Sequence, residues 1–185
     1  MINKHVEKAI NEQIAKEMFS ANLYLAMSAF YKAKNLNGFA NWMRVQAQEE
    51  SAHAMIFFDY LIERGGEVRL SAIDAPQSEW NTPLAAFEAA YAHEQHITAS
   101  INAIAEVAMQ EKDFETTTFL QWFITEQVEE EANASEFGEL TGRMKQASIK
   151  SALVSASFFP IIMSLGAIGT GLALTLGGAG VLRPE

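Results

Sequence analysis

Four segments of helical periodicity, separated by links of very unequal length, restrict the possible fold more than any other feature of this sequence. Apolar residues recur every three or four positions in residues 3–34, 38–64 and 83–111 and again from residue 114 onward. A link of about three residues joins the first two segments and one of about one or two residues joins the last two, so each pair should form an antiparallel hairpin. Residues 67–82 connect the hairpins and, when extended, can cross the length of a bundle. The pattern predicts an all-α four-helix bundle, two antiparallel hairpins with a long crossover.

Residues typical of helix ends stand at these boundaries. We expect Asn37 to cap the second helix, and the pair Gly65-Gly66 to end it. Thr82 followed by Pro83 is typical of a cap and a first helical residue. Asp113 is expected to cap the fourth helix. Helix boundaries are therefore predicted independently of the apolar pattern.

Composition narrows the possible functions. The chain has 185 residues, 49% of them hydrophobic, which suits a domain with a sizeable core. It has no cysteine, so disulfides and thiolate metal sites are excluded. A net charge of −10 argues against nucleic acid as a partner, because phosphate binding needs an excess of Lys and Arg. The first residues contain no apolar signal core, and we expect a cytoplasmic location.

Each predicted helix carries metal-binding side chains among its apolar positions. These residues are Glu17, Glu50, His53, Glu94, Gln127 and Glu130. A buried carboxylate is costly unless it is paired or bound to metal, and several together repel one another. One carboxylate from each helix, combined with a Glu-x-x-His pair, is the pattern of di-iron carboxylate bundles. The alternative, a solvated acidic face, does not fit the surrounding apolar period.

Residues 1–136 resemble a bacterial non-haem ferritin. The resemblance lies in the stretches NEQIAKEMFSANLYLAMS, AQEESAHA, HEQHITASINAIAEVA and FLQWFITEQVEEE. It implies a ferritin-like bundle with a ferroxidase centre that oxidises Fe(II) with O₂ or hydrogen peroxide, and a homo-oligomeric 24-subunit cage that stores Fe(III) mineral. By this resemblance one iron is held by Glu17, Glu50 and His53. Glu50 would bridge to a second iron held by Glu94 and Glu130, with Gln127 nearby.

The same resemblance assigns further residues around the centre. Glu49, Glu126, Glu129 and Glu130 resemble a third iron site, for which the alternative is an acidic surface. Tyr24 resembles the tyrosine beside the iron centre, as an electron donor or as a hydrogen-bonded core tyrosine. Trp122 is expected to pack near the centre rather than to donate electrons. No methionine stands at Ser51 or Ala52, and the fourth helix has no second Glu-x-x-His, so the resemblance implies no haem.

The C-terminal part departs from this pattern. Residues 151–182 contain no charged residue and no histidine, and this run exceeds the roughly 20 residues that span a bilayer. We therefore divide the chain into a di-iron bundle, residues 1–150, and an apolar tail, residues 151–185. Gly138 and Gly142 are expected to interrupt the fourth helix. The tail is open to three interpretations: an anchor to the cytoplasmic face of a membrane, a replacement fifth helix, or a non-native end.

Three functions are compatible with these features. The leading hypothesis is an iron-storage ferritin with ferroxidase activity, in which the tail decides whether a cage can form. The second is another di-iron enzyme, an oxygenase or peroxidase. The third is a membrane-tethered or non-cage di-iron protein for iron delivery or peroxide detoxification.

Overall fold

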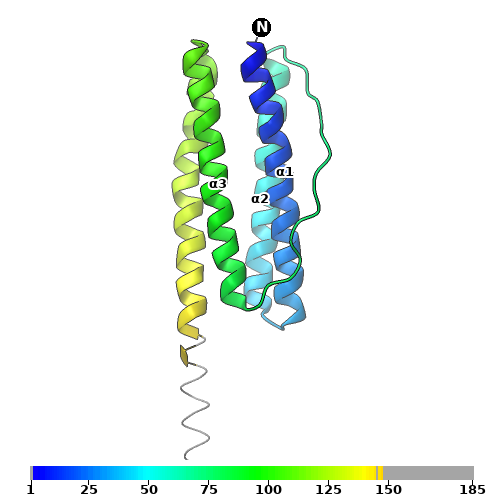
Figure 1. Ribbon diagram of the computed structural model, residues 1–185, viewed down its shortest axis with the longest axis vertical. Coiled ribbons are helices and arrows are strands. Elements are labelled where there is room, and N and C mark those ends of the chain that lie inside the picture. Colours follow the sequence, from blue (N-terminus) through cyan, green and yellow to red (C-terminus); the bar gives the residue numbers. More distant parts are fainter. Residues whose placement is uncertain (1, 145, 148–185) are drawn as a thin grey trace, which may run out of the picture. The chain divides into compact units, whose positions relative to one another are not determined.

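The computed structural model describes residues 2–144 and 146–147, and these residues contain helices and no strands. α1 spans Lys4–Ala33, α2 spans Asn37–Glu63 and α3 spans Pro83–Gln110. A fourth helix covers residues 114–144. Short links join α1 to α2 and α3 to the fourth helix, and a long extended segment runs back along the first hairpin to reach α3 (Figure 1). The predicted bundle of two hairpins with a long crossover is confirmed.

The chain divides into two compact units, residues 1–139 and residues 140–185. The first unit contains α1, α2, α3 and most of the fourth helix. In the second unit the structure describes only residues 140–144 and 146–147, all of them helical. The predicted boundary at residue 150 and the tail of residues 151–185, with its three interpretations, lie outside the described residues. Within residues 2–144 and 146–147 no helix combines the length and apolar character that a membrane crossing requires.

The expected break of the fourth helix at two glycines is wrong. Gly138 and Gly142 both lie inside the helix of residues 114–144. An isolated glycine costs a helix only about 1 kcal/mol relative to alanine, which the surrounding helical turns offset. Space does not explain Gly138 either, because a Cβ added there would meet its nearest neighbour, Phe87 Cβ, at an ordinary 3.8 Å.

Most of the predicted helix ends are confirmed. Thr82 Oγ1 accepts a hydrogen bond from Ala85 N at 3.0 Å, and Asp113 Oδ1 accepts one from Thr116 N at 3.1 Å. Gly65, in the left-handed region at φ 69°, follows the end of α2. The prediction for Asn37 is wrong, since Asn37 begins α2 and its Oδ1 accepts from Lys32 Nζ at 2.7 Å. The N-cap position falls on Leu36, which makes no side-chain cap.

The crossover is fixed to the first hairpin near its start and near its end. Asn11 on α1 donates to the carbonyl of Glu67 at 3.0 Å and accepts from the backbone N–H of Arg69 at 2.6 Å. At the far end Trp80 is buried, with its ring 5.2 Å from the ring of Phe30. The segment between these points is largely exposed. These contacts hold the extended crossover along α1.

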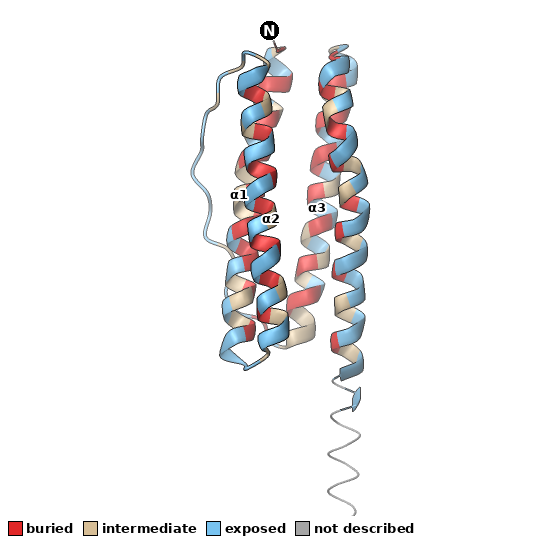
Figure 2. Ribbon diagram, turned by 180° about the vertical axis from the view of Figure 1, so that it is seen from behind, coloured by how far each residue is buried: buried red, intermediate tan, exposed pale blue. Residues whose placement is uncertain are grey.

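Two apolar clusters build the core of the bundle, and a belt of buried polar residues lies between them along the helices. The first cluster includes Ile10, Ile14, Phe57, Ile101 and Phe123. The second includes Tyr24, Met27, Tyr31, Met43 and Phe87. Buried residues follow the inward faces of all the helices (Figure 2). The polar belt places titratable side chains at mid-bundle, where water is excluded.

Candidate metal centre

The polar belt contains every residue that the sequence predicts for the two main iron positions. Each of these side chains is at most 4% exposed, although all are polar and most are acidic: Glu17, Glu50, His53, Glu94, Gln127 and Glu130. Their helices supply them in the predicted order, with Glu17 on α1, Glu50 and His53 on α2, Glu94 on α3 and the last two on the fourth helix. The acids therefore occupy positions on the apolar face of each helix, which points into the bundle rather than to solvent.

Glu17, Glu50 and His53 form the first group with the geometry of a metal site. Each offers one ligand atom, and these atoms lie within 4.8 Å of one another. His53 Nδ1 lies 3.7 Å from Glu50 Oε2. Glu17 Oε2 and Glu50 Oε2 are buried and accept no hydrogen bond from the part of the chain that the structure describes. Buried carboxylate oxygens are normally paired, so these two are suited to a bound cation.

Neighbouring side chains orient Glu94 and Glu130, the ligands predicted for the second iron. The hydroxyl of Tyr24 donates to Glu94 Oε1, and Gln127 Nε2 donates to Glu94 Oε2 at 3.3 Å. Gln46 Nε2 donates to Glu130 Oε2 at 2.7 Å. The ligand atoms of Glu94 and Glu130 do not join the 4.8 Å group around Glu17. Their charges nevertheless help to raise the pKa of Glu50.

Burial raises the pKa of all four carboxylates in this belt, and repulsion between them adds to the rise for Glu17, Glu50 and Glu130. Burial is the largest cause throughout. It raises the pKa of Glu17 and Glu50 well above the ordinary value, helped by the charge of Glu50 on Glu17 and that of Glu94 on Glu50. The pKa of Glu94 is also raised, and that of Glu130 is raised to about 8 by burial and by Glu94. Without a cation the centre therefore retains protons, and a divalent ion would displace them.

A second group shares the histidine. The ligand atoms of Glu49, His53 and Glu126 also lie within 4.8 Å of one another, with both glutamates half-buried. Glu129, predicted to belong to this third site, is exposed and is not part of the group. Glu130 lies in the belt. The structure thus brings together part of the predicted third site beside the main centre.

The two aromatic residues singled out by the sequence differ in environment. Tyr24 is fully buried, and its hydroxyl is bonded to Glu94. Trp122 is 47% exposed, and its ring contacts that of His53 edge-on with 5.4 Å between centroids. Tyr24 therefore contacts a carboxylate of the centre directly, whereas Trp122 covers its histidine from outside.

Sequence reasoning missed the amides that orient the carboxylates. Gln13 Nε2 donates to Glu17 Oε1 at 2.8 Å, and Gln46 reaches Glu130 across the bundle. A signal was present, because Gln13 precedes Glu17 by four residues and Gln46 precedes Glu50 by four. Residues four apart share a helical face, so both amides had to face the same interior as the acids.

Comparison with known proteins identifies the family. The family model of the ferritin-like domain matches residues 7–144. A bacterial non-heme ferritin of Bacteroides fragilis (strain 638R) is 44% identical over 149 residues, which cover 80% of this chain and 94% of the relative. The chain belongs to the ferritin family. The match of the family model extends beyond residue 136, the predicted end of the resemblance, and the fourth helix likewise continues through Gly138 and Gly142.

Solved ferritin structures agree with this assignment. The open pore ferritin from the archaeon Archaeoglobus fulgidus shares 52% sequence identity, covering 75% of this chain and 86% of that one, with a TM-score of 0.74. The Chlorobium tepidum ferritin shares 36% identity, covering 84% and 98% of the two chains, with a TM-score of 0.77. Family membership makes this protein an iron-binding, iron-storing oxidoreductase.

Proposed function

We propose that this ferritin is a ferroxidase that oxidises Fe(II) at a di-iron centre in the polar belt of each subunit. The supporting observation is the group of Glu17, Glu50 and His53, where two buried carboxylate oxygens have no hydrogen-bond partner among the described residues. Carboxylate and imidazole together suit iron. In this proposal Glu17, Glu50 and His53 bind one Fe(II). Glu50 bridges to a second Fe(II) bound by Glu94 and Glu130, with Gln127 beside it.

The chemistry requires little of the protein beyond holding the two substrate ions. Each Fe(II) gives up one electron, and O₂ with two protons accepts both electrons to form hydrogen peroxide. With hydrogen peroxide as oxidant, the same two electrons and two protons yield two water molecules. Binding of Fe(II) displaces the protons that the carboxylates hold, because metal ligands bind in their deprotonated form. Where a third Fe(II) is oxidised as well, Tyr24, bonded to Glu94, is suited to supply the fourth electron and its phenolic proton, so that O₂ with three further protons is reduced to two water molecules.

The remaining assignments complete the proposal. Glu49 and Glu126, with His53 between them, are suited to a third iron, and Glu129 and Glu130 extend this acidic region. We expect assembly into a 24-subunit cage that stores the Fe(III) as mineral, a cytoplasmic location and no haem. The solved relatives are themselves ferritins, and one is described as an open pore ferritin.

Replacing the bridging carboxylate tests the proposal. Glu50→Ala should lower the initial rate of Fe(II) oxidation at least about 100-fold, since it removes a ligand from both irons, and outer partners of a metal site alone are worth 10–100-fold. The matched control is Glu63→Ala, an exposed glutamate on the same helix, which should keep the wild-type rate. Circular dichroism should show an unchanged helix content in both variants. An unchanged initial rate in Glu50→Ala would overturn the di-iron assignment.

A stoichiometric measurement separates storage from other di-iron chemistry. Wild-type protein should continue to oxidise Fe(II) well beyond two equivalents per chain and keep the product in solution as mineral. An oxygenase or peroxidase of the same fold would stop near two equivalents unless an organic substrate were added. Precipitation of Fe(III) outside the protein would contradict a storage cage.

A further inference from the structure

A chain of hydrogen bonds runs from the surface of the bundle to Glu17. Lys16 Nζ donates to Ser100 Oγ at 2.6 Å, and Ser100 Oγ donates to Gln13 Oε1 at 2.6 Å. Gln13 Nε2 then donates to Glu17 Oε1 at 2.8 Å. Gln13 is fully buried and Ser100 is 7% exposed. The chain therefore crosses from α1 to α3 and back within the packed interior.

The order of donors fixes the orientation of every group in this chain. A lysine ammonium can only donate, so the oxygen of Ser100 must accept from Lys16. The single hydroxyl proton of Ser100 is then directed to Gln13, which must present its carbonyl oxygen on that side. The amide nitrogen of Gln13 is left facing Glu17, as a donor. Glu17 Oε1 is consequently held by a donor whose own orientation is determined at the other end.

This arrangement distinguishes the two oxygens of Glu17. Oε1 accepts from Gln13, whereas Oε2 is buried without a hydrogen-bond partner among the described residues, and one carboxylate oxygen of Glu17 belongs to the group with Glu50 and His53. A carboxylate free to rotate would present either oxygen, or both. Held in this way, Glu17 offers one oxygen to an ion and keeps the other on the amide.

The outer end of the chain lies where a charge costs little. Lys16 is half-buried and lines a cavity of about 240 Å³ between α1, α3 and the crossover, beside Asp74, His93 and His96. Its ammonium keeps access to water while its hydrogen bond reaches inward. The inner end, in contrast, contains only neutral groups until Glu17. The ammonium of Lys16 orients the chain of hydrogen bonds without placing a positive charge next to the iron ligands.

We infer that Gln13, Ser100 and Lys16 are positioning residues that make Glu17 a one-oxygen ligand of the first iron. This inference rests on the proposed function, because it takes Glu17 to be an iron ligand. The three residues do not touch the ion. They act through Glu17, in the way that outer hydrogen-bond partners orient the ligands of other metal sites.

Cobalt(II) provides a probe that reports ligand geometry without turnover. Its visible absorption is strong at low coordination number and weakens as ligands are added. Gln13→Leu should free Glu17 to bind with both oxygens, which raises the coordination number and lowers the absorption per bound Co(II). Affinity for the first Co(II) should fall roughly 10–100-fold, as for other outer partners of metal ligands. A direct titration followed in the visible range measures both quantities on the assembled protein.

Serine variants keep the test informative if Gln13→Leu does not fold. Ser100→Ala should weaken Co(II) binding and change the spectrum in the same direction as Gln13→Leu, by a smaller factor. Ser100→Thr retains the hydroxyl and should restore both to wild-type values. The matched control is Ser20→Ala, another buried serine, whose hydroxyl contacts His93 Nε2 at 2.7 Å and the backbone carbonyl of Lys16 at 3.1 Å but takes no part in the side-chain hydrogen bonds that end at Glu17. It should bind Co(II) as the wild type does.

The outcomes separate this inference from the proposed function. A wild-type spectrum and affinity in folded Gln13→Leu or in Ser100→Ala would overturn the positioning role and leave the iron centre in place. An equal loss in Ser20→Ala and Ser100→Ala would also overturn it, because packing rather than the chain would then be responsible. Co(II) binding that is unaffected by Glu17→Ala would overturn the assignment of Glu17 and with it the inference.

Discussion

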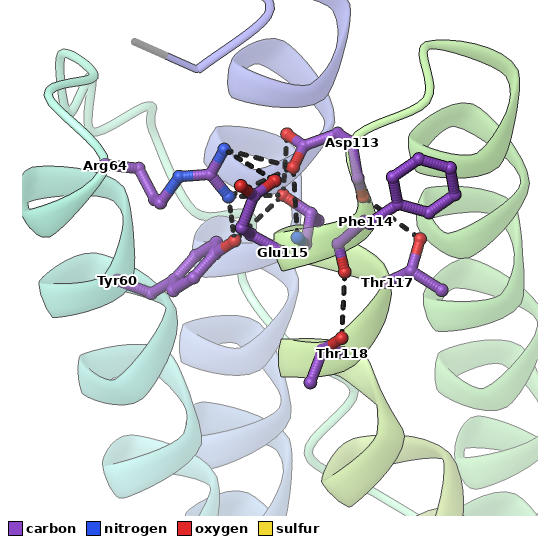
Figure 3. A network of polar contacts seen from close by, with 8 residues as sticks. Tyr60, Arg64, Asp113, Phe114, Glu115, Thr117 and Thr118 are labelled. Atoms are coloured by element: carbon purple, nitrogen blue, oxygen red, sulfur yellow. Dashed lines mark hydrogen bonds and ion pairs between the residues drawn. The ribbon is translucent and has the colours of Figure 1, made fainter.

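Buried acids at the middle and at one end of this bundle differ in their hydrogen bonds and in the direction in which their pKa is shifted. At mid-bundle, Glu17 and Glu50 each retain a buried oxygen without a hydrogen-bond partner among the described residues, and burial raises their pKa. At the end where α2 stops and the fourth helix begins, Asp113 is also buried, yet its oxygens accept hydrogen bonds from Arg64 and Thr116 (Figure 3). A buried carboxylate therefore has an oxygen without a hydrogen bond at mid-bundle, whereas at the end of the bundle both of its oxygens accept hydrogen bonds.

The end network shows what a structural acid looks like in this fold. Both terminal nitrogens of Arg64 donate to Asp113 Oδ1 at 3.0 Å, and Thr116 Oγ1 donates to Asp113 Oδ2 at 2.9 Å. Tyr60 shares a hydrogen bond with Thr116 at 2.9 Å. Burial alone would raise the pKa of Asp113, but the bonds from Thr116 and Arg64 outweigh it and hold the pKa below its ordinary value. This network stabilises the ionised acid with protein groups, whereas the mid-bundle carboxylates would be stabilised in the ionised form by a bound metal ion.

The largest effect should come from supplying that cation. At a free Zn(II) concentration 100 times the dissociation constant, each occupied site should add about 2.7 kcal/mol to the free energy of unfolding. Urea titrations with and without Zn(II) measure the increase. Asp113→Ala should show the same increase from its own lower baseline, and Glu50→Ala should lose most of it. Equal stabilisation of Glu50→Ala and wild type would place the bound metal elsewhere.

Breaking the satisfied network should give the next largest effect. Asp113→Ala removes a helix cap and the partner of Arg64, and it should lower the free energy of unfolding by about 3 kcal/mol. The initial rate of Fe(II) oxidation should remain that of the wild type in the folded variant. Glu115→Ala is the matched control, since this exposed acid lies 3.8 Å from Arg64 and should cost less than about 0.5 kcal/mol. Similar losses of unfolding free energy in Asp113→Ala and Glu115→Ala would contradict the stabilising role assigned to the Asp113 network.

The two regions should respond to pH with opposite signs. Because the pKa of Glu130 is raised to about 8 in the folded state, the metal-free fold binds protons that the unfolded chain releases. The stability of the metal-free protein should therefore fall as pH rises from about 4.5 to about 8. Asp113, with a lowered pKa, contributes stability above its ordinary pKa of about 3.9, and this is lost as pH falls further.

Melting temperatures of the metal-free protein across this range measure the dependence. Glu130→Gln removes a titrating group and should flatten the decline above pH 5, whereas Asp113→Ala should leave that decline unchanged. A metal-free stability that increases steadily from pH 5 to pH 8 would show that the belt carboxylates are already satisfied by protein groups.

The smallest effect concerns the ring that covers His53. Trp122 contacts His53 edge-on and is half exposed, so Trp122→Phe should retain the contact and change the initial oxidation rate by less than about twofold. Stopped-flow measurement of Fe(II) oxidation tests this. Tyr24→Phe is the informative counterpart, because it removes a hydroxyl bonded to Glu94 and should slow oxidation more. A larger loss in Trp122→Phe would assign electron transfer to the tryptophan.

The sequence predicts acids in this fold better than it predicts the groups that orient them. Glu17, Glu94 and Glu130 could be placed inside because an acid within an apolar helical period leaves no other interpretation. Gln13 and Gln46 stand four residues before Glu17 and Glu50, so their inward direction could be predicted, but the carboxylate that each amide bonds could not. Their roles depend on contacts across the bundle, as with Ser100 on α3 and Lys16 on α1.

Helix ends show the same division. Thr82 and Asp113 were predicted because a cap is a local hydrogen bond between residues three apart. Asn37 was misplaced because the side chain of Lys32, on the preceding helix, takes its oxygen. The continuation of the fourth helix past Gly138 was missed because a propensity cost of about 1 kcal/mol was weighed without the helical turns on either side. Hydrogen bonds between residues close in sequence can be predicted from the sequence, whereas competing hydrogen bonds from another helix cannot.

The most direct test of the account is to locate the iron. Crystals soaked anaerobically in Fe(II) and measured at the iron absorption edge give the metal positions from anomalous scattering. The account predicts two strong iron peaks in each bundle, one within coordination distance of Glu17, Glu50 and His53, and one within reach of Glu50, Glu94 and Glu130. Iron found only beside Glu49 and Glu126, or no iron in the polar belt, would contradict it.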